Sequence, residues 1–226
     1  MYNIAFYFLL YIIYSMIGWL LEVVWTFITD KKLVNRGFLI GPYCPIYGTG
    51  CILMILLLQK YSNDILVLFI MSMFICSILE YATSYFMEKI FKARWWDYSN
   101  RKFNINGRIC LETLIPFGIL GCVLIYALNP FFSKLIKAIP SNILIIISGI
   151  VFIAFLIDNI VSFKVISKIK VSSQKLIEDN TEEITKKVRE YISKYSKSGK
   201  RLMQSFPNIK ILKERFKVKR KDNMDK

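Results

Sequence analysis

The chain has 226 residues, of which 55% are hydrophobic, and its mean hydropathy is +0.44. Soluble domains are less apolar and lack long uncharged stretches, so this composition excludes an ordinary soluble protein. The net charge of +15 is uneven, because residues 1–163 hold 12 Lys or Arg and 8 Asp or Glu, whereas residues 164–226 hold 19 and 8. The sequence therefore predicts a transmembrane domain over residues 1–163 and a basic cytoplasmic tail over residues 164–226.

The sequence contains no histidine, which excludes histidine-based catalytic triads and imidazole metal sites. Its five cysteines have apolar neighbours and no Cys-x-x-Cys spacing, which favours buried small side chains over a metal or redox site. No phosphate-binding Walker A sequence is present, so ATP could act only through a separate ATPase subunit. We therefore expect no cofactor and no metal, and the sequence favours a protein without enzymatic activity.

Five stretches approach the roughly 20 apolar residues that cross a bilayer. They predict an all-α polytopic membrane protein with helices at about 4–28, 45–60, 64–86, 108–128 and 142–163. Lys and Arg are concentrated in the segments 29–44 and 87–107 and in the tail, while the other loops are poor in them. The positive-inside rule then places the N-terminus outside and the C-terminus in the cytoplasm.

The second of these stretches is broken at its start, where Gly41, Pro42 and Pro45 prevent a regular helix. Irregular backbone at membrane depth is tolerated only where it is buried in protein or lines a cavity. Because proline suits the first turn of a helix, we expect a re-entry near Gly41 and a helix from about Pro45 to Gln59. The N-terminus of this helix would point at a polar site, as half-helices do in many transporters. The alternative is an interfacial loop followed by a short ordinary span.

Four carboxylates fall in the cytoplasmic halves of the predicted spans, namely Glu22, Glu80, Glu112 and Asp158. Charges are costly in a bilayer and usually face the interior of the helix bundle. Arg108 and Glu112 are four residues apart and can pair on a helix. Snorkelling at the helix ends is the alternative for all four, and it suits Asp158 best and Glu22 and Glu80 least.

The loop 92–107 is rich in aromatic and basic residues. Its two tryptophans and Tyr98 have rings that commonly sit at headgroup level, which predicts an interfacial anchor. A second interpretation is that Arg94, Asp97 and Asn104 close the cytoplasmic mouth of a polar cavity. Both interpretations place the loop on the cytoplasmic side.

The basic tail contains a capping sequence at residues 180–183, which predicts a helix after it, and a break at residues 197–200. Residues 210–221 mix apolar and basic side chains, which suits binding to the anionic lipids of the inner leaflet. The tail has no recognition module for nucleic acid, so no nucleic-acid partner is expected.

Several short motifs resemble those of a known family: Gly18-Trp19-x-x-Glu22, Asn35-Arg-Gly-Phe-Leu, Gly41-Pro42, Cys44-Pro-Ile-Tyr-Gly48, Arg94-Trp-Trp-Asp-Tyr-Ser99 and Asn104-Ile-Asn-Gly-Arg108. In type and order they are similar to those of the ABC-transporter type IV (CmpB-like) membrane proteins. The resemblance covers about residues 5–160 and leaves out the tail. It implies a permease-like component of the cell membrane that works with a separate ATPase subunit. Five spans are few for a whole transporter, so a homodimer is expected as well.

The intramembrane charges and the irregular backbone together define one candidate substrate-binding cavity that opens to the cytoplasm. We expect it to be lined by Glu22, Arg36, Gly41, Tyr47, Glu80, Arg94, Asp97, Asn104, Arg108 and Glu112. Transport is the favoured function. Two alternatives stay open: an intramembrane enzyme that uses carboxylates as acid and base on a lipid or lipid-linked substrate, and a membrane scaffold whose tail recruits partners. The residues name neither a substrate nor a catalytic group.

Overall fold

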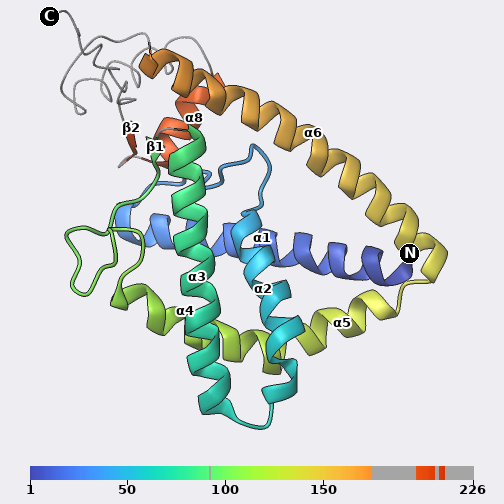
Figure 1. Ribbon diagram of the computed structural model, residues 1–226. Helices are drawn as coiled ribbons and strands as arrows, with labels where there is room; N and C mark the ends of the chain where they lie inside the picture. The colour runs from blue at the N-terminus through green and yellow to red at the C-terminus, as the bar shows by residue number, and fades with distance from the viewer. Residues whose placement is uncertain (92, 175–196, 207–208, 212–226) are drawn as a thin grey trace, which may run out of the picture.

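The structure, a computed structural model, describes residues 1–91, 93–174, 197–206 and 209–211. Helices make up most of this part of the chain (Figure 1), as the composition predicts. The bundle contains α1 (Tyr2–Asp30), α2 (Pro45–Leu58), α3 (Ile65–Phe91), α4 (Leu111–Val123), α5 (Asn129–Lys137) and α6 (Ser141–Gln174). The tail adds α8 (Lys197–Ser205), and an antiparallel pair joins β1 (Ala93–Arg94) to β2 (Lys210–Ile211).

Among the described residues, four helical segments are long and apolar enough to cross a membrane: Tyr2–Asp30, Ile65–Phe91, Leu111–Lys137 and Ser141–Lys164. The third segment joins α4 to α5 through a π-helical turn, η2 (Leu124–Leu128). The chain is therefore a multi-pass membrane protein. The count of five spans stays a prediction, because α2 has only 14 residues. At 1.5 Å per residue such a helix is about 21 Å long, while the hydrocarbon core is about 30 Å thick.

The break before the second helix is present where the glycines and prolines predict it. Residues 31–44 contain no helix, and α2 starts with Pro45 in its first turn. The backbone N–H of Cys44 donates to the Ser15 carbonyl oxygen at 2.9 Å, so α2 begins level with the middle of α1. After α2, the chain passes through a 3-10 turn, η1 (Gln59–Tyr61), into α3. The predicted helix from about Pro45 to Gln59 is thus confirmed to within one residue.

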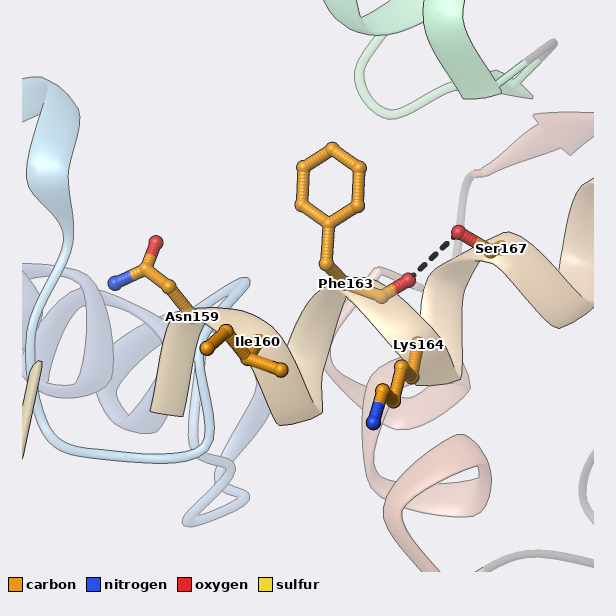
Figure 2. Close-up of a pocket in the computed structure, with 5 residues that line it drawn as sticks. All are labelled: Asn159, Ile160, Phe163, Lys164 and Ser167. Atoms are coloured by element: carbon orange, nitrogen blue, oxygen red, sulfur yellow. Dashed lines mark hydrogen bonds between the residues drawn. The ribbon is translucent and has the colours of Figure 1, made fainter. Parts of the chain in front are cut away.

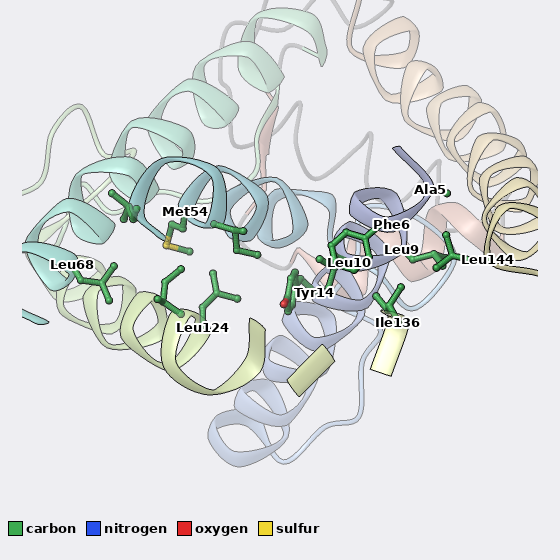
Figure 3. Close-up of a cluster of buried hydrophobic side chains, with 13 residues drawn as sticks. Ala5, Phe6, Leu9, Leu10, Tyr14, Met54, Leu68, Leu124, Ile136 and Leu144 are labelled. Carbon is green, nitrogen blue, oxygen red and sulfur yellow. The ribbon is translucent and has the colours of Figure 1, made fainter. Parts of the chain in front are cut away.

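The main apolar core joins the first half of α1 to the second half of α2 and to the ends of the neighbouring helices (Figure 3). Its buried members are Ala5, Phe6, Leu9, Leu10, Tyr14, Met54, Ile55, Leu58, Leu68, Leu124, Ile125, Ile136 and Leu144. Because lipid tails are as apolar as these side chains, close packing rather than exclusion of water stabilises this cluster within a bilayer. All the buried members from α1 precede Ser15, whereas Glu22 lies in the second half of this helix.

A second buried cluster joins the tail to the end of α3 and the following loop. It consists of Phe91, Ala93, Trp95, Leu202, Met203 and Ile209. Arg201 of α8 also donates to the carbonyl oxygens of Gly37 and Phe38, at 3.0 and 3.3 Å. The predicted break at residues 197–200 is wrong, because α8 begins at Lys197 and includes its glycine, and the next turn of this helix buries Leu202 and Met203 in the cluster with Trp95. The division at residue 163 stays a prediction, although α6 runs on to Gln174.

The capping sequence at residues 180–183 and the helix predicted after it lie outside the described residues. The same holds for residues 212–221 of the predicted lipid-binding stretch.

We expect Leu202→Asp to release α8 while leaving the protein inserted in the membrane. Leu202 is 1% exposed, and burying an unpaired charge among apolar side chains is strongly unfavourable. Limited proteolysis of membranes should cleave the tail of this variant faster than that of the wild type. Gln204→Asp is the matched control, because Gln204 is an exposed residue of the same helix. Equal cleavage of the two variants would show that the buried contact does not hold α8 in place.

Candidate functional site

The first group of predicted site residues surrounds the N-terminus of α2. The Tyr47 hydroxyl donates to Glu22 Oε1 at 2.6 Å, and Arg36 Nε lies 3.7 Å from Glu22 Oε2. Tyr47 packs so closely over Gly18 that a Cβ there would lie 2.2 Å from its ring. Burial and the Glu22 carboxylate raise the pKa of the Cys44 thiol to about 12, while Arg36 opposes the shift. The thiol therefore stays protonated at neutral pH, and both charged groups lie close to the helix start.

Glu80 on α3 extends this group. Its side chain is buried, with 8% of the residue exposed, and its Oε1 accepts a hydrogen bond from the Tyr98 hydroxyl at 3.3 Å. Burial raises the pKa of Tyr98, and the Glu80 and Glu22 carboxylates raise it further, so the phenol stays protonated and can donate. The second oxygen of Glu80, Oε2, is buried without a hydrogen-bond partner. No ion pair between described residues involves Glu80.

The second group lies between the end of α3 and the loop after it, and its centre is Glu88. Glu88 Oε2 is 3.0 Å from Arg94 Nε and 3.1 Å from Arg108 Nη2. Arg94 also lies 3.6 Å from Asp97, and the Arg108 guanidinium sits over the rings of Tyr81 and Tyr85. The Trp96 indole donates to the Arg108 carbonyl oxygen at 3.0 Å. Through these contacts the charged side chains hold the loop after α3 against that helix.

Two predicted site residues lie away from both groups. Asn104 donates to the carbonyl oxygens of Ser99 and Arg101, at 3.2 and 2.8 Å, so it closes the loop on itself. Glu112 is 59% exposed and pairs with Arg101 at 3.1 Å. The expected pair of Arg108 with Glu112 is wrong, because α4 begins at Leu111 and Arg108 precedes the helix on which four-residue spacing would apply.

Asp158 has a structural role that the sequence did not reveal, and Gly41 is part of it. The carboxylate accepts the backbone N–H groups of Ile40 and Gly41, at 3.1 and 2.7 Å, and the hydroxyl groups of Tyr43 and Ser162, at 2.6 and 2.9 Å. The expected snorkelling of Asp158 is therefore wrong, since its oxygens are bound to the segment before α2. The signal for this role is physical: a non-helical segment at membrane depth needs acceptors for its N–H groups.

The family of the chain follows from its sequence profile. A family model described as "Putative ABC-transporter type IV" matches residues 9–163. The chain belongs to the ABC-transporter type IV family. Searches of curated proteins and of solved structures found no significant match. The matched range of this ABC-transporter type IV protein includes both charged groups and ends before α8.

The two groups of this ABC-transporter type IV protein differ in what they can offer a ligand. In the second group, Glu88 and Asp97 pair with the guanidinium groups of Arg94 and Arg108, and only Arg108 Nε lacks a hydrogen-bond partner among their described guanidinium nitrogens that are buried. In the first, Arg36 lies between Glu22 and the carbonyl oxygen of Ser205, but its Nε has no hydrogen-bond partner among the described residues. Glu80 Oε2 likewise has no hydrogen-bond partner among the described residues. The first group can therefore offer a polar ligand both an acceptor, Glu80 Oε2, and a donor, Arg36 Nε, close to the start of α2.

Proposed function

We propose that this chain is the permease-like component of a transport system in the cell membrane. Its family and its four long apolar helices support a membrane transport component. In the proposed orientation the N-terminus is outside and the C-terminus is in the cytoplasm. The group Glu22, Arg36, Tyr47, Glu80 and Tyr98 then forms the substrate-binding cavity and opens toward the cytoplasm.

One observation carries this proposal: a short helix starts inside the protein beside two carboxylates from two other helices. The N-terminus of α2 lies level with Ser15, Tyr47 in its first turn binds Glu22, and Glu80 keeps one oxygen free. Many secondary transporters bind substrate at the ends of such discontinuous helices near the bilayer midplane. Buried carboxylates at that depth are costly, and in membrane proteins they commonly mark ion or substrate pathways.

The partners follow from the same proposal. A separate ATPase subunit supplies the energy, because the chain has no phosphate-binding Walker A sequence of its own. A homodimer provides enough helices to enclose a pathway. The basic tail contacts the anionic inner leaflet, and about 1 kcal/mol per basic residue near the surface favours this contact.

The test compares molecules that co-purify with the wild type, Glu22→Gln and Glu80→Gln after mild detergent extraction. Each substitution removes a charged acceptor, and hydrogen bonds to charged groups contribute about 1.5–3 kcal/mol. Retention of a polar ligand, measured by mass spectrometry, should therefore fall roughly 10- to 100-fold. The co-purifying ATPase should remain.

Glu112→Gln is the matched control, because this carboxylate is exposed and pairs only with Arg101 among the described residues. It should retain the ligand as the wild type does. Full retention in both buried variants would reject the cavity. Equal loss in all three would point to general destabilisation, which a size-exclusion profile of each variant checks.

A further inference from the structure

A groove lies along one face of α6, close to where the last candidate span ends. It is shallow and open, with a volume of about 640 Å³, and the described residues that line it are Asn159, Ile160, Phe163, Lys164 and Ser167. This spacing of three and four residues repeats over two turns, so the five side chains share one side of the helix. Figure 2 shows them projecting from successive turns of α6, with the Ser167 hydroxyl bonded to the Phe163 carbonyl oxygen at 2.8 Å.

The groove combines apolar side chains with one cation at the edge of the span. Ile160 and Phe163 are about half exposed, with 49% and 48% of their surface accessible. The apolar segment that can cross the membrane ends at Lys164, which puts the ammonium group at the level of lipid headgroups. No ion pair between described residues involves Lys164. The Lys164 side chain is itself exposed.

We propose that this groove binds an anionic phospholipid of the inner leaflet. The lipid phosphate lies on the Lys164 ammonium group, and an acyl chain lies against Ile160 and Phe163. The charge and the apolar surface match the two ends of a phospholipid, and anionic lipids are concentrated in the cytoplasmic leaflet. The leaflet assignment rests on the proposed orientation, which puts the end of α6 and the basic tail in the cytoplasm.

The position of the groove gives a bound lipid a structural consequence. The Phe163 ring also packs against Phe91 at the end of α3, with 5.0 Å between ring centroids. From the same stretch of α6, Asp158 and Ser162 bind the segment that leads into α2. A lipid in the groove therefore contacts the stretch of α6 that holds both α3 and the start of α2.

Site-specific photo-crosslinking in native membranes tests the proposal on the full-length chain. A photoreactive amino acid replaces Ile160 in one sample and Ile153 in another, and mass spectrometry identifies the lipid class that each captures. Ile153 is the positional control, because it is 59% exposed on the same helix two turns deeper in the apolar segment. At position 160 we expect acidic phospholipids to be enriched about fivefold over position 153, the effect of one basic residue near an anionic surface.

A second variant separates the charge of Lys164 from the position of the probe. Lys164→Gln should bring the capture at position 160 down to the level seen at position 153. Lys134→Gln should change nothing, because Lys134 is an exposed lysine at the end of the preceding span. The proposal would be overturned by an equal lipid composition at positions 160 and 153, by a Lys164→Gln variant that captures lipids as before, or by capture of a protein in place of a lipid. If the selectivity for acidic lipids is absent but ligand retention still depends on Glu80, the lipid site alone is rejected and the proposed function stands.

Discussion

Replacing Asp158 by alanine should lower the stability of the protein by about 1–3 kcal/mol, because the Gly41 N–H and the Tyr43 hydroxyl are partly buried donors that would lose their acceptor. No helix accepts the Gly41 N–H in this segment, whereas the Ile40 N–H is in an exposed contact and also reaches Ser162 Oγ at 3.2 Å. Burial and Asp158 raise the pKa of Tyr43, so its phenol stays protonated and donates at neutral pH. Thermal unfolding of the purified variant in detergent, followed by the fluorescence of a thiol-reactive dye, measures the loss.

Two further variants show which property of the carboxylate matters. Asp158→Asn keeps one acceptor oxygen, so its unfolding temperature should lie between those of Asp158→Ala and the wild type. Glu112→Ala should unfold like the wild type, because exposed ion pairs such as the one with Arg101 contribute about 0–1 kcal/mol. If Asp158→Ala also unfolds at the wild-type temperature, the segment before α2 does not depend on this carboxylate.

What the sequence predicts correctly here follows from local chemistry. Pro45 starts α2 because proline has no N–H to lose in a first turn, and the glycines and prolines before it exclude a helix. Hydropathy likewise identifies the long helices, with α1 and α3 extending a few residues beyond their predicted ends into polar sequence. None of these features depends on which distant segment lies nearby.

The contacts that the sequence does not reveal join segments far apart in the chain. Asp158 binds Gly41, 117 residues away, and Arg201 binds Gly37, 164 residues away. Likewise, Arg108 approaches Glu88 only because the loop folds back onto α3. A helical spacing rule cannot foresee these pairs, and it fails for Arg108 and Glu112 because the helix starts three residues after the arginine. The sequence predicts the burial of Glu80. Whether its second oxygen finds a hydrogen-bond donor depends on how the loop after α3 folds.

Gly48→Ala should open the junction between α1 and α2. A Cβ at this position would lie 2.2 Å from Ser15 Oγ and 2.5 Å from the backbone carbonyl oxygen of Tyr11. The Ser15 hydroxyl could rotate away. The Tyr11 carbonyl is part of the backbone of α1 and cannot, so α1 and α2 must separate. Overpacking of this kind typically costs about 1–3 kcal/mol. The higher helix propensity of alanine returns only about 0.5–1 kcal/mol, so the net effect is destabilising.

Gly149→Ala on α6 is the control, because a Cβ there meets no described atom within 4 Å beyond its chain neighbours and its own helix backbone. It should leave the unfolding temperature unchanged or raise it, while Gly48→Ala lowers it. Separation of the helices would also pull Tyr47 from Glu22, since Tyr47 precedes Gly48 and its hydroxyl lies only 2.6 Å from the carboxylate. Ligand retention by Gly48→Ala should therefore fall together with its stability. A variant that keeps the wild-type unfolding temperature would show that α1 and α2 do not approach each other this closely, and the polar group at the start of α2 would need a different geometry.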